Sequence, residues 1–109
     1  MATGEMLRTL ALGLEGTAEA PHFERMAYRV NRIYVTLAGD RKTANFWFTP
    51  EEQEMKCAIY PEAFAPLPNK WGAQGWTRCI LSKLTKVELK AALETAYVHG
   101  AAKHGRGKA

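Results

Sequence analysis

Between residues 26 and 48 the chain alternates apolar and polar side chains with a period of two, and this run constrains the fold most. The segments 26–30 and 32–38 meet at Asn31-Arg32, and a third segment, 42–48, follows a second short turn. A period of two is typical of half-buried β-strands. Strands joined by such short turns pair antiparallel. The sequence therefore predicts an antiparallel meander at the centre of the fold.

The segments around this meander have helical periodicity. Residues 4–15 place apolar side chains on one stripe, and Thr49 and Thr85 each have a Glu three positions later, which is the pattern of a helix-starting capping box. Residues 17–23, interrupted by Pro21, are predicted to form a loop. With a fourth strand at 76–81, the predicted order is α-β-β-β-α-β-α. This order indicates a two-layer α+β domain whose antiparallel sheet carries helices on one face.

Length and composition favour one soluble domain over residues 1–102. The chain has 109 residues, of which 47% are hydrophobic, and no apolar run is long enough to span a membrane. The first residues do not have the pattern of a secretory signal. Two cysteines are too few for a disulfide framework, and they have no zinc-site spacing. We therefore expect a cytoplasmic protein with no membrane partner, no metal and no cofactor.

The formal net charge of +4 is distributed unevenly. Three of the cations lie in residues 103–109, which are predicted to form a basic flexible tail, and without them twelve Lys and Arg face eleven Asp and Glu. Two stretches, 25–42 and 70–90, each carry a net charge of +4. A nucleic-acid interpretation therefore depends on this local segregation of charge and not on the total.

The sheet face opposite the helices is predicted to combine aromatic and basic residues. The alternation assigns to it the side chains of Arg29, Tyr34, Thr36, Asn45 and Trp47, with Trp76 and Arg78 added from the fourth strand. Aromatic rings among arginines can stack on bases while the guanidinium groups pair with phosphates. Trp, Tyr and Arg are also typical of protein–protein hot spots. A third interpretation is that these rings cover one another.

The segment 71–77, Trp-Gly-Ala-Gln-Gly-Trp-Thr, is the most distinctive in the chain. Two Trp residues, each next to a Gly, indicate a bent loop whose backbone approaches another group closely. Gln74 at its tip and Lys70 just before it favour polar contacts with a ligand. The alternative is a tightly packed loop that the two Trp side chains anchor.

Catalytic patterns are absent from the sequence. It contains neither a nucleophile-elbow nor a phosphate-loop motif. His22, with Glu19 and Glu24 nearby, is the main acid–base candidate, and it supports a third hypothesis of an enzyme or small-ligand binder centred on His22 and the 71–76 loop. Because no nucleophile accompanies His22, we assign no catalytic residues and expect a non-enzymatic protein.

Several segments, in this order, resemble the MmcQ/YjbR family of small bacterial proteins. They are Pro21-His22-Phe23, Tyr28-Arg29-Val30, residues 33–37, residues 49–53, residues 61–64 and the Trp-Gly and Gln-Gly-Trp-Thr parts of residues 71–77. The resemblance implies a CyaY-like (frataxin-like) α+β fold and a DNA-binding role through a double-wing arrangement. It implies no catalytic residues. Frataxin-like iron binding is not expected, since the first helix offers only Glu5 and Glu15 and the first strand carries Arg29.

The residues and the resemblance together predict a DNA-binding protein that uses basic hairpins and the aromatic and arginine-bearing sheet face. The predicted contacts are Arg29, Arg32, Arg41, Lys42, Trp47, Lys70, Gln74, Trp76 and Arg78. The alternative is an adaptor that binds a protein partner through the same face.

Overall fold

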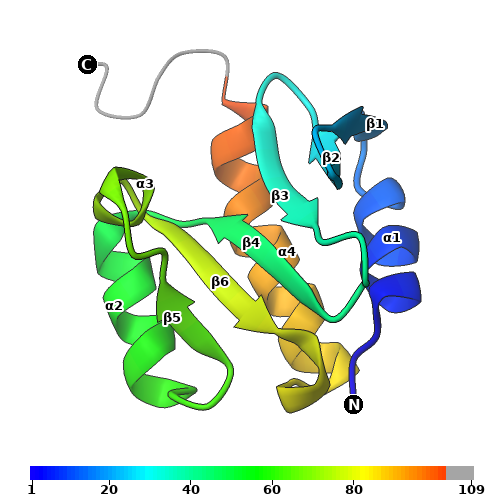
Figure 1. The fold of residues 1–109 in the computed structure, drawn as a ribbon. Helices are drawn as coiled ribbons and strands as arrows, with labels where there is room; N and C mark the ends of the chain where they lie inside the picture. Colours follow the sequence, from blue (N-terminus) through cyan, green and yellow to red (C-terminus); the bar gives the residue numbers. More distant parts are fainter. Residues whose placement is uncertain (103–109) are drawn as a thin grey trace.

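A six-stranded antiparallel sheet forms one layer of the molecule, with the strand order β1-β2-β3-β4-β6-β5 (Figure 1). The computed structural model describes residues 1–102. The strands are β1 (Ala18–His22), β2 (Arg25–Arg29), β3 (Ile33–Leu37), β4 (Thr43–Trp47), β5 (Phe64–Pro66) and β6 (Trp76–Ile80). Every neighbouring pair is antiparallel, and the short turns of the sequence predicted this for the meander of β2, β3 and β4.

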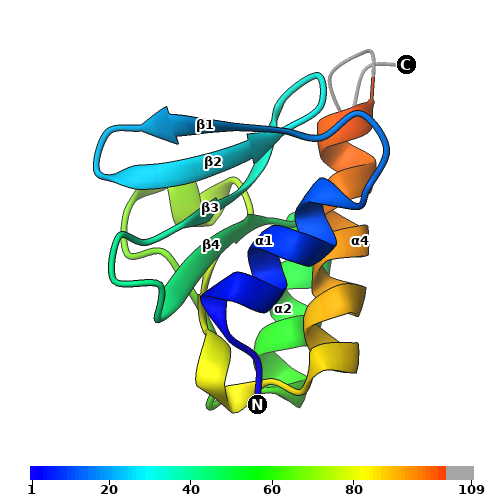
Figure 2. The ribbon, with the colours of Figure 1, turned by 90° about the vertical axis from the view of Figure 1, so that its right-hand side faces the viewer.

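Three helices cover one face of this sheet (Figure 2). They are α1 (Gly4–Leu12), α2 (Pro50–Ile59) and α4 (Lys86–Ala101). The short helix α3 (Lys70–Ala73) and a 3-10 turn (Leu81–Lys83) precede and follow β6. Both predicted capping boxes form at the starts of α2 and α4. The two-layer α+β class predicted from the sequence is confirmed.

Residues 17–23 are not the predicted loop, because most of them form strand β1. Pro21 pairs with Met26 in the register of β1 and β2, and β1 has a neighbouring strand on one side only. A proline is tolerated at such an edge because an edge strand does not need every backbone N–H for pairing. Strand β5 and helix α3 were also not predicted, since three or four residues are too few to show a period.

Tyr34 was predicted on the open sheet face, but its side chain is fully buried. In the pairing of β2 with β3, Tyr28 lies opposite Val35 and Arg29 opposite Ile33, so the register shifts at Tyr34 and the regular alternation of faces is interrupted there. Its hydroxyl oxygen is 2.8 Å from Thr17 Oγ1, and its ring makes an edge contact with Tyr97 of α4. Tyr34 therefore belongs to the core between the sheet and the helices.

The β2–β3 turn is held against the end of α4. The backbone N–H groups of Asn31 and Arg32 both donate to the Gly100 carbonyl at 3.0 Å, and Asn31 Nδ2 donates to the Ala101 carbonyl at 2.8 Å. By contrast, the β1–β2 hairpin projects from the sheet on the side away from the helices (Figure 2). The projecting hairpin is thus β1–β2, and not the β2–β3 hairpin that turns at Asn31-Arg32.

Within residues 1–102, no helix combines the length and apolar character needed to cross a membrane. The predicted basic tail, 103–109, lies outside the described residues.

Candidate nucleic-acid interface

The sheet face away from the helices, called the open face here, has a floor of small or polar side chains. One cross-strand row runs through all six strands as directly opposed residues. Its members are Ala20, Ala27, Thr36, Asn45, Arg78 and Ala65. The row contains one cation and no carboxylate. A flat ligand can therefore approach this part of the sheet closely.

A groove of about 270 Å³ lies on this face between the tip of the β1–β2 hairpin and the α3 segment. We call it the sheet groove; it is lined by His22, Phe23, Arg25, Thr36, Asn45, Leu67, Trp71 and Trp76. Typical small-molecule pockets measure roughly 300–1,000 Å³. The sheet groove is therefore the size for one planar group and not for a whole cofactor.

Phe23 forms the tip of the β1–β2 hairpin in an unusual conformation. It is 93% exposed and has a φ of 60°, in the left-handed region that bulky residues rarely adopt. Phe23 and Glu24 are the two turn residues that join the opposed pair His22 and Arg25. Two-residue hairpin turns favour Gly or Asn where φ is positive. A strained and exposed aromatic residue at this place is a pointer to function.

Arg25 lies at the base of the hairpin and points along the floor of the groove. Its Nε donates to Thr36 Oγ1 at 2.8 Å, and Nη2 donates to the Thr36 carbonyl at 3.2 Å. Partial burial lowers the pKa of Arg25, and Asp40 acts in the opposite direction. An arginine nevertheless keeps its charge at neutral pH. The structure thus places a fixed positive charge inside an aromatic-walled groove.

Trp76 joins the groove to a cluster of stacked side chains. The rings of Trp76 and Trp47 are stacked with centroids 6.1 Å apart, and the Arg32 guanidinium carbon lies 5.8 Å from the Trp47 ring centroid. The edge of His99 from α4 also contacts Trp47. Trp47 is therefore partly covered by its neighbours, as the third interpretation from the sequence stated, whereas Trp76 lines the groove.

The glycines of the 71–77 segment allow very close backbone packing. A Cβ atom on Gly72 would lie 1.9 Å from the Leu67 carbonyl oxygen, and one on Gly75 would lie 1.8 Å from that of Phe48. Gln53 Nε2 fixes the segment by donating to the carbonyls of Gly72 and Trp76 at 3.0 and 3.1 Å. The segment is therefore a tightly packed loop, and this packing also leaves Trp71 49% exposed beside the groove.

Four of the predicted contact residues lie on or beside the groove. Trp76 lines it, Arg78 follows on the same face of β6, and Lys70 and Gln74 are exposed at the two ends of α3. The Lys70 ammonium lies 5.8 Å from the centroid of the Trp71 ring. Trp47 stacks on Trp76, and the Arg32 guanidinium group lies over the Trp47 ring.

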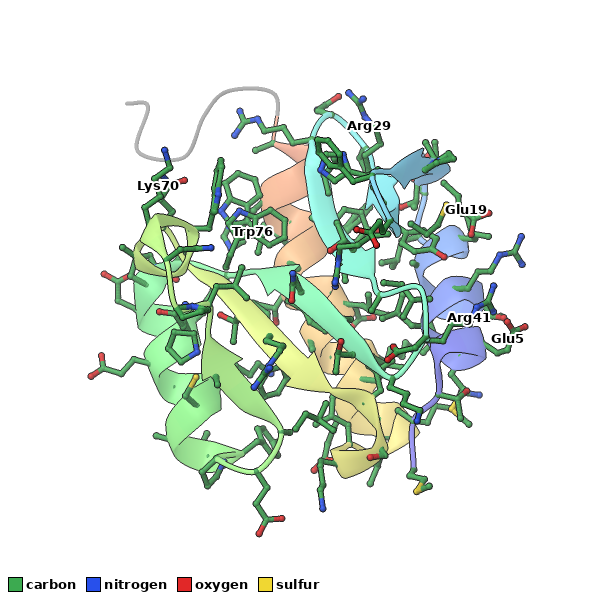
Figure 3. All side chains as sticks on the ribbon, viewed as in Figure 1. Glu5, Glu19, Arg29, Arg41, Lys70 and Trp76 are labelled. Carbon is green, nitrogen blue, oxygen red and sulfur yellow. The ribbon has the colours of Figure 1, made fainter. Side chains whose placement is uncertain are left out.

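The other predicted contacts are separated from this group. Arg41 forms an ion pair with Glu5 of α1, on the side of the molecule opposite Lys70 and Trp76 (Figure 3). Lys42 follows Arg41 in the same β3–β4 turn. Arg29 lies at the far end of β2, where Nη2 donates to the Asn31 carbonyl. In the basic stretch 70–90, Lys83 belongs to the 3-10 turn, and Lys86 and Lys90 belong to α4. The structure therefore divides this stretch between the sheet layer and the helix layer.

Most carboxylates are also on the helix side of the molecule. Seven of the eleven Asp and Glu residues lie on the helices or directly after α1, and an eighth, Glu19, is hydrogen-bonded to Arg8 of α1. These eight are Glu5, Glu15, Glu19, Glu51, Glu52, Glu54, Glu88 and Glu94. The hydrogen bond from Arg8 lowers the pKa of Glu19 and keeps it ionised. The open face therefore combines aromatic rings and cations with fewer carboxylates than the helix side, and of these Glu24 and Asp40 lie near Arg25.

Sequence reasoning missed Phe23, Arg25 and Trp71 as a group. The hairpin leaves only a weak signal in the sequence, the dipeptide Phe23-Glu24 between two five-residue segments, which is the spacing of a two-residue turn. The predicted loop over residues 17–23 concealed this hairpin. The enzyme hypothesis did correctly associate His22 with the 71–76 loop, because both contribute to the sheet groove.

His99, which contacts the Trp47 ring, forms a partly buried pair with Glu52. Glu52 Oε1 lies 2.8 Å from His99 Nε2 and also accepts the backbone N–H of Thr49 at 2.8 Å. Burial by itself would raise the pKa of Glu52, but the hydrogen bonds from Thr49 and His99 outweigh it and hold this pKa below its usual value. The carboxylate thus joins the start of α2 to the end of α4.

Glu52→Gln is expected to lower the free energy of unfolding by about 1 kcal/mol at pH 7, because Gln can keep the capping box but loses the charge that strengthens the hydrogen bonds with Thr49 and His99. Since the folded-state pKa of Glu52 is lowered, its charge stabilises the fold above the unfolded-state pKa of about 4.3. This contribution is lost as the pH falls through the folded-state value. Urea titrations from pH 7 to pH 3 should show that the free energy of unfolding decreases less on acidification for Glu52→Gln than for the wild type. Glu54→Gln, exposed on the same helix, should follow the wild type.

Neither cysteine is suited to nucleophilic chemistry. Burial raises the pKa of Cys79 to about 12 and also raises the pKa of Cys57. Over residues 1–102, the structure contains no group of three or more His, Cys, Asp or Glu side chains arranged to hold a metal ion.

Two comparisons with known proteins bear on this molecule. The family model described as YjbR matches residues 12–99. The crystal structure of Deinococcus radiodurans protein DR2400, described with the domain DUF419, is similar with a TM-score of 0.79 and 21% sequence identity, over 99% of this chain and 86% of that chain. At this identity the similarity shows the fold. No curated protein sequence matches the chain.

Proposed function

The chain belongs to the YjbR family, and from this premise we propose that it is a non-enzymatic DNA-binding protein whose contact surface is the open face with the β1–β2 hairpin. The observation that carries the proposal is the separation of charge between the two layers. Arg25, Lys70 and Arg78 surround aromatic rings on or beside the open face, while most carboxylates lie on the helix side. Such a surface attracts a polyanion and supplies stacking partners for its bases.

The adaptor hypothesis uses the same surface, because exposed Phe, Trp and Arg also dominate protein interfaces. The two proposals differ in their dependence on salt. Neutralising phosphates releases counterions, and each neutralised phosphate adds about 0.7–0.9 to the slope of log affinity against log salt. Three cations at the groove therefore predict a slope of about −2 to −3 for DNA.

The test is fluorescence anisotropy with end-labelled DNA, single-stranded and duplex, between roughly 50 and 200 mM salt. Arg78→Glu should weaken binding by about tenfold and reduce the salt slope by about one. Lys90→Glu is the matched control, because Lys90 is an exposed cation on α4 in the other layer. It should leave the affinity within about twofold of the wild type.

The absence of DNA binding at about 50 mM salt, or a flat salt response, would contradict the proposal. Equal weakening by Arg78→Glu and Lys90→Glu would show that net charge, and not the open face, determines the affinity.

A further inference from the structure

We infer that the sheet groove binds one unpaired base, and hence that the DNA ligand is single-stranded or locally unpaired. This inference rests on the proposed function and specifies its ligand. It follows from the walls, the floor and the surroundings of the groove.

The walls of the groove are aromatic on both sides. Phe23 and His22 come from the hairpin tip, Trp71 comes from α3, and Trp76 comes from the start of β6. Every base has a flat π-face, so such rings hold bases by stacking without reading their sequence. A base inside a duplex is already stacked on its neighbours and cannot enter between these walls.

The backbone of Phe23 indicates that its ring is there for binding. The hairpin turn would be less strained with Gly at this position, where φ is 60°. The ring also gains little from packing, since it is 93% exposed and, among residues 1–102, its one ring contact is with the neighbouring His22. The chain thus keeps a large aromatic side chain at a position that favours Gly, beside the groove.

The floor offers hydrogen-bonding groups that the rest of the described chain does not use. Asn45 is half-buried, and its side-chain amide makes no hydrogen bond within residues 1–102. Arg25 donates to Thr36 through Nε and Nη2, and its Nη1 makes no hydrogen bond in the same part of the chain. An amide with a donor and an acceptor, next to an arginine, matches the donor and acceptor edge of a base.

The surroundings suit the sugar-phosphate chain on either side of that base. Lys70 lies beside Trp71 on α3, and Arg78 lies directly opposite Asn45 across the strands. These cations can contact the phosphates of the flanking nucleotides, while the volume of about 270 Å³ admits one base at a time.

The test compares three labelled ligands of about 12 nucleotides, a length within the known site sizes for single strands. They are a mixed-sequence single strand, a strand of the same length made of abasic residues, and the duplex. The wild type should bind the base-containing strand at least about tenfold more tightly than the other two. The abasic strand retains the phosphates, so it isolates the contribution of the bases.

Two groove variants and one control complete the design. Phe23→Gly and Trp71→Ala should each remove most of the preference for the base-containing strand without changing the affinity for the abasic strand. Phe23→Gly should also raise the melting temperature by roughly 4 °C, since it relieves the strained turn. Val87→Ala, an exposed apolar site on α4, should leave all three affinities unchanged.

Equal affinity for the three ligands, or an unchanged preference in both groove variants, would overturn the inference and leave the proposed function intact. Failure to bind any of the three ligands at low salt would overturn both.

Discussion

Gly75→Ala is expected to lower the free energy of unfolding by about 3 kcal/mol or more, or to prevent folding. Gly75 has a φ of 106°, which side-chain-bearing residues rarely adopt. A Cβ atom there would also lie 1.8 Å from the Phe48 carbonyl oxygen, which is a backbone atom and cannot rotate away. The Gly75 carbonyl accepts the backbone N–H of Phe48, directly after β4, at 3.2 Å, so the strain would spread to the sheet.

Urea denaturation followed by far-UV circular dichroism measures this loss. Gly13→Ala is the control, because a Cβ atom on Gly13 would make ordinary contacts of 3.4 and 3.5 Å and its φ of −78° is accessible to alanine. Gly13→Ala should change the stability by less than about 1 kcal/mol. Similar effects of the two substitutions would contradict the close approach at Gly75.

Tyr34→Ala is expected to lower the free energy of unfolding by about 4 kcal/mol. Its ring is fully buried between the sheet and the helices, so its removal leaves a cavity lined by Tyr97 and the backbone of Gly100. Tyr34→Phe keeps the ring and loses the contact with Thr17 Oγ1, which should cost about 1 kcal/mol.

The matched control is Trp71→Ala, a larger aromatic residue that is 49% exposed at the groove. It should change the stability by less than about 1 kcal/mol. The order of the losses, with Tyr34→Ala far above Trp71→Ala, distinguishes the core from the open face. The reverse order would mean that Tyr34 is the exposed ring.

The sequence predicted the parts of this fold that local physics determines. Alternation fixed the meander of β2, β3 and β4, and the capping boxes at Thr49 and Thr85 fixed the starts of α2 and α4. Tyr34 was misplaced because alternation assumes a regularly paired strand, whereas the register between β2 and β3 shifts at Tyr34. Strand pairing of that kind depends on the three-dimensional path of the chain.

The groove could be predicted only in pieces, for a related reason. The 71–77 motif and His22 were both visible in the sequence, but their proximity depends on strand β1, which Pro21 concealed. Arg41 stood out as a basic residue in a turn, and the periodicity gave no sign that Glu5 of α1 would pair with it. Long-range electrostatic partners of this kind do not follow from a local pattern.

Proline lies in both outermost strands of the sheet, Pro21 in β1 and Pro66 in β5. A bare strand edge is a template on which another polypeptide can add a strand, and aggregation and domain swapping begin in this way. A proline has no N–H to offer to an added strand, and β5 is only three residues long. The chain can therefore display an uncovered sheet with protruding aromatic rings while both margins of that sheet resist self-association.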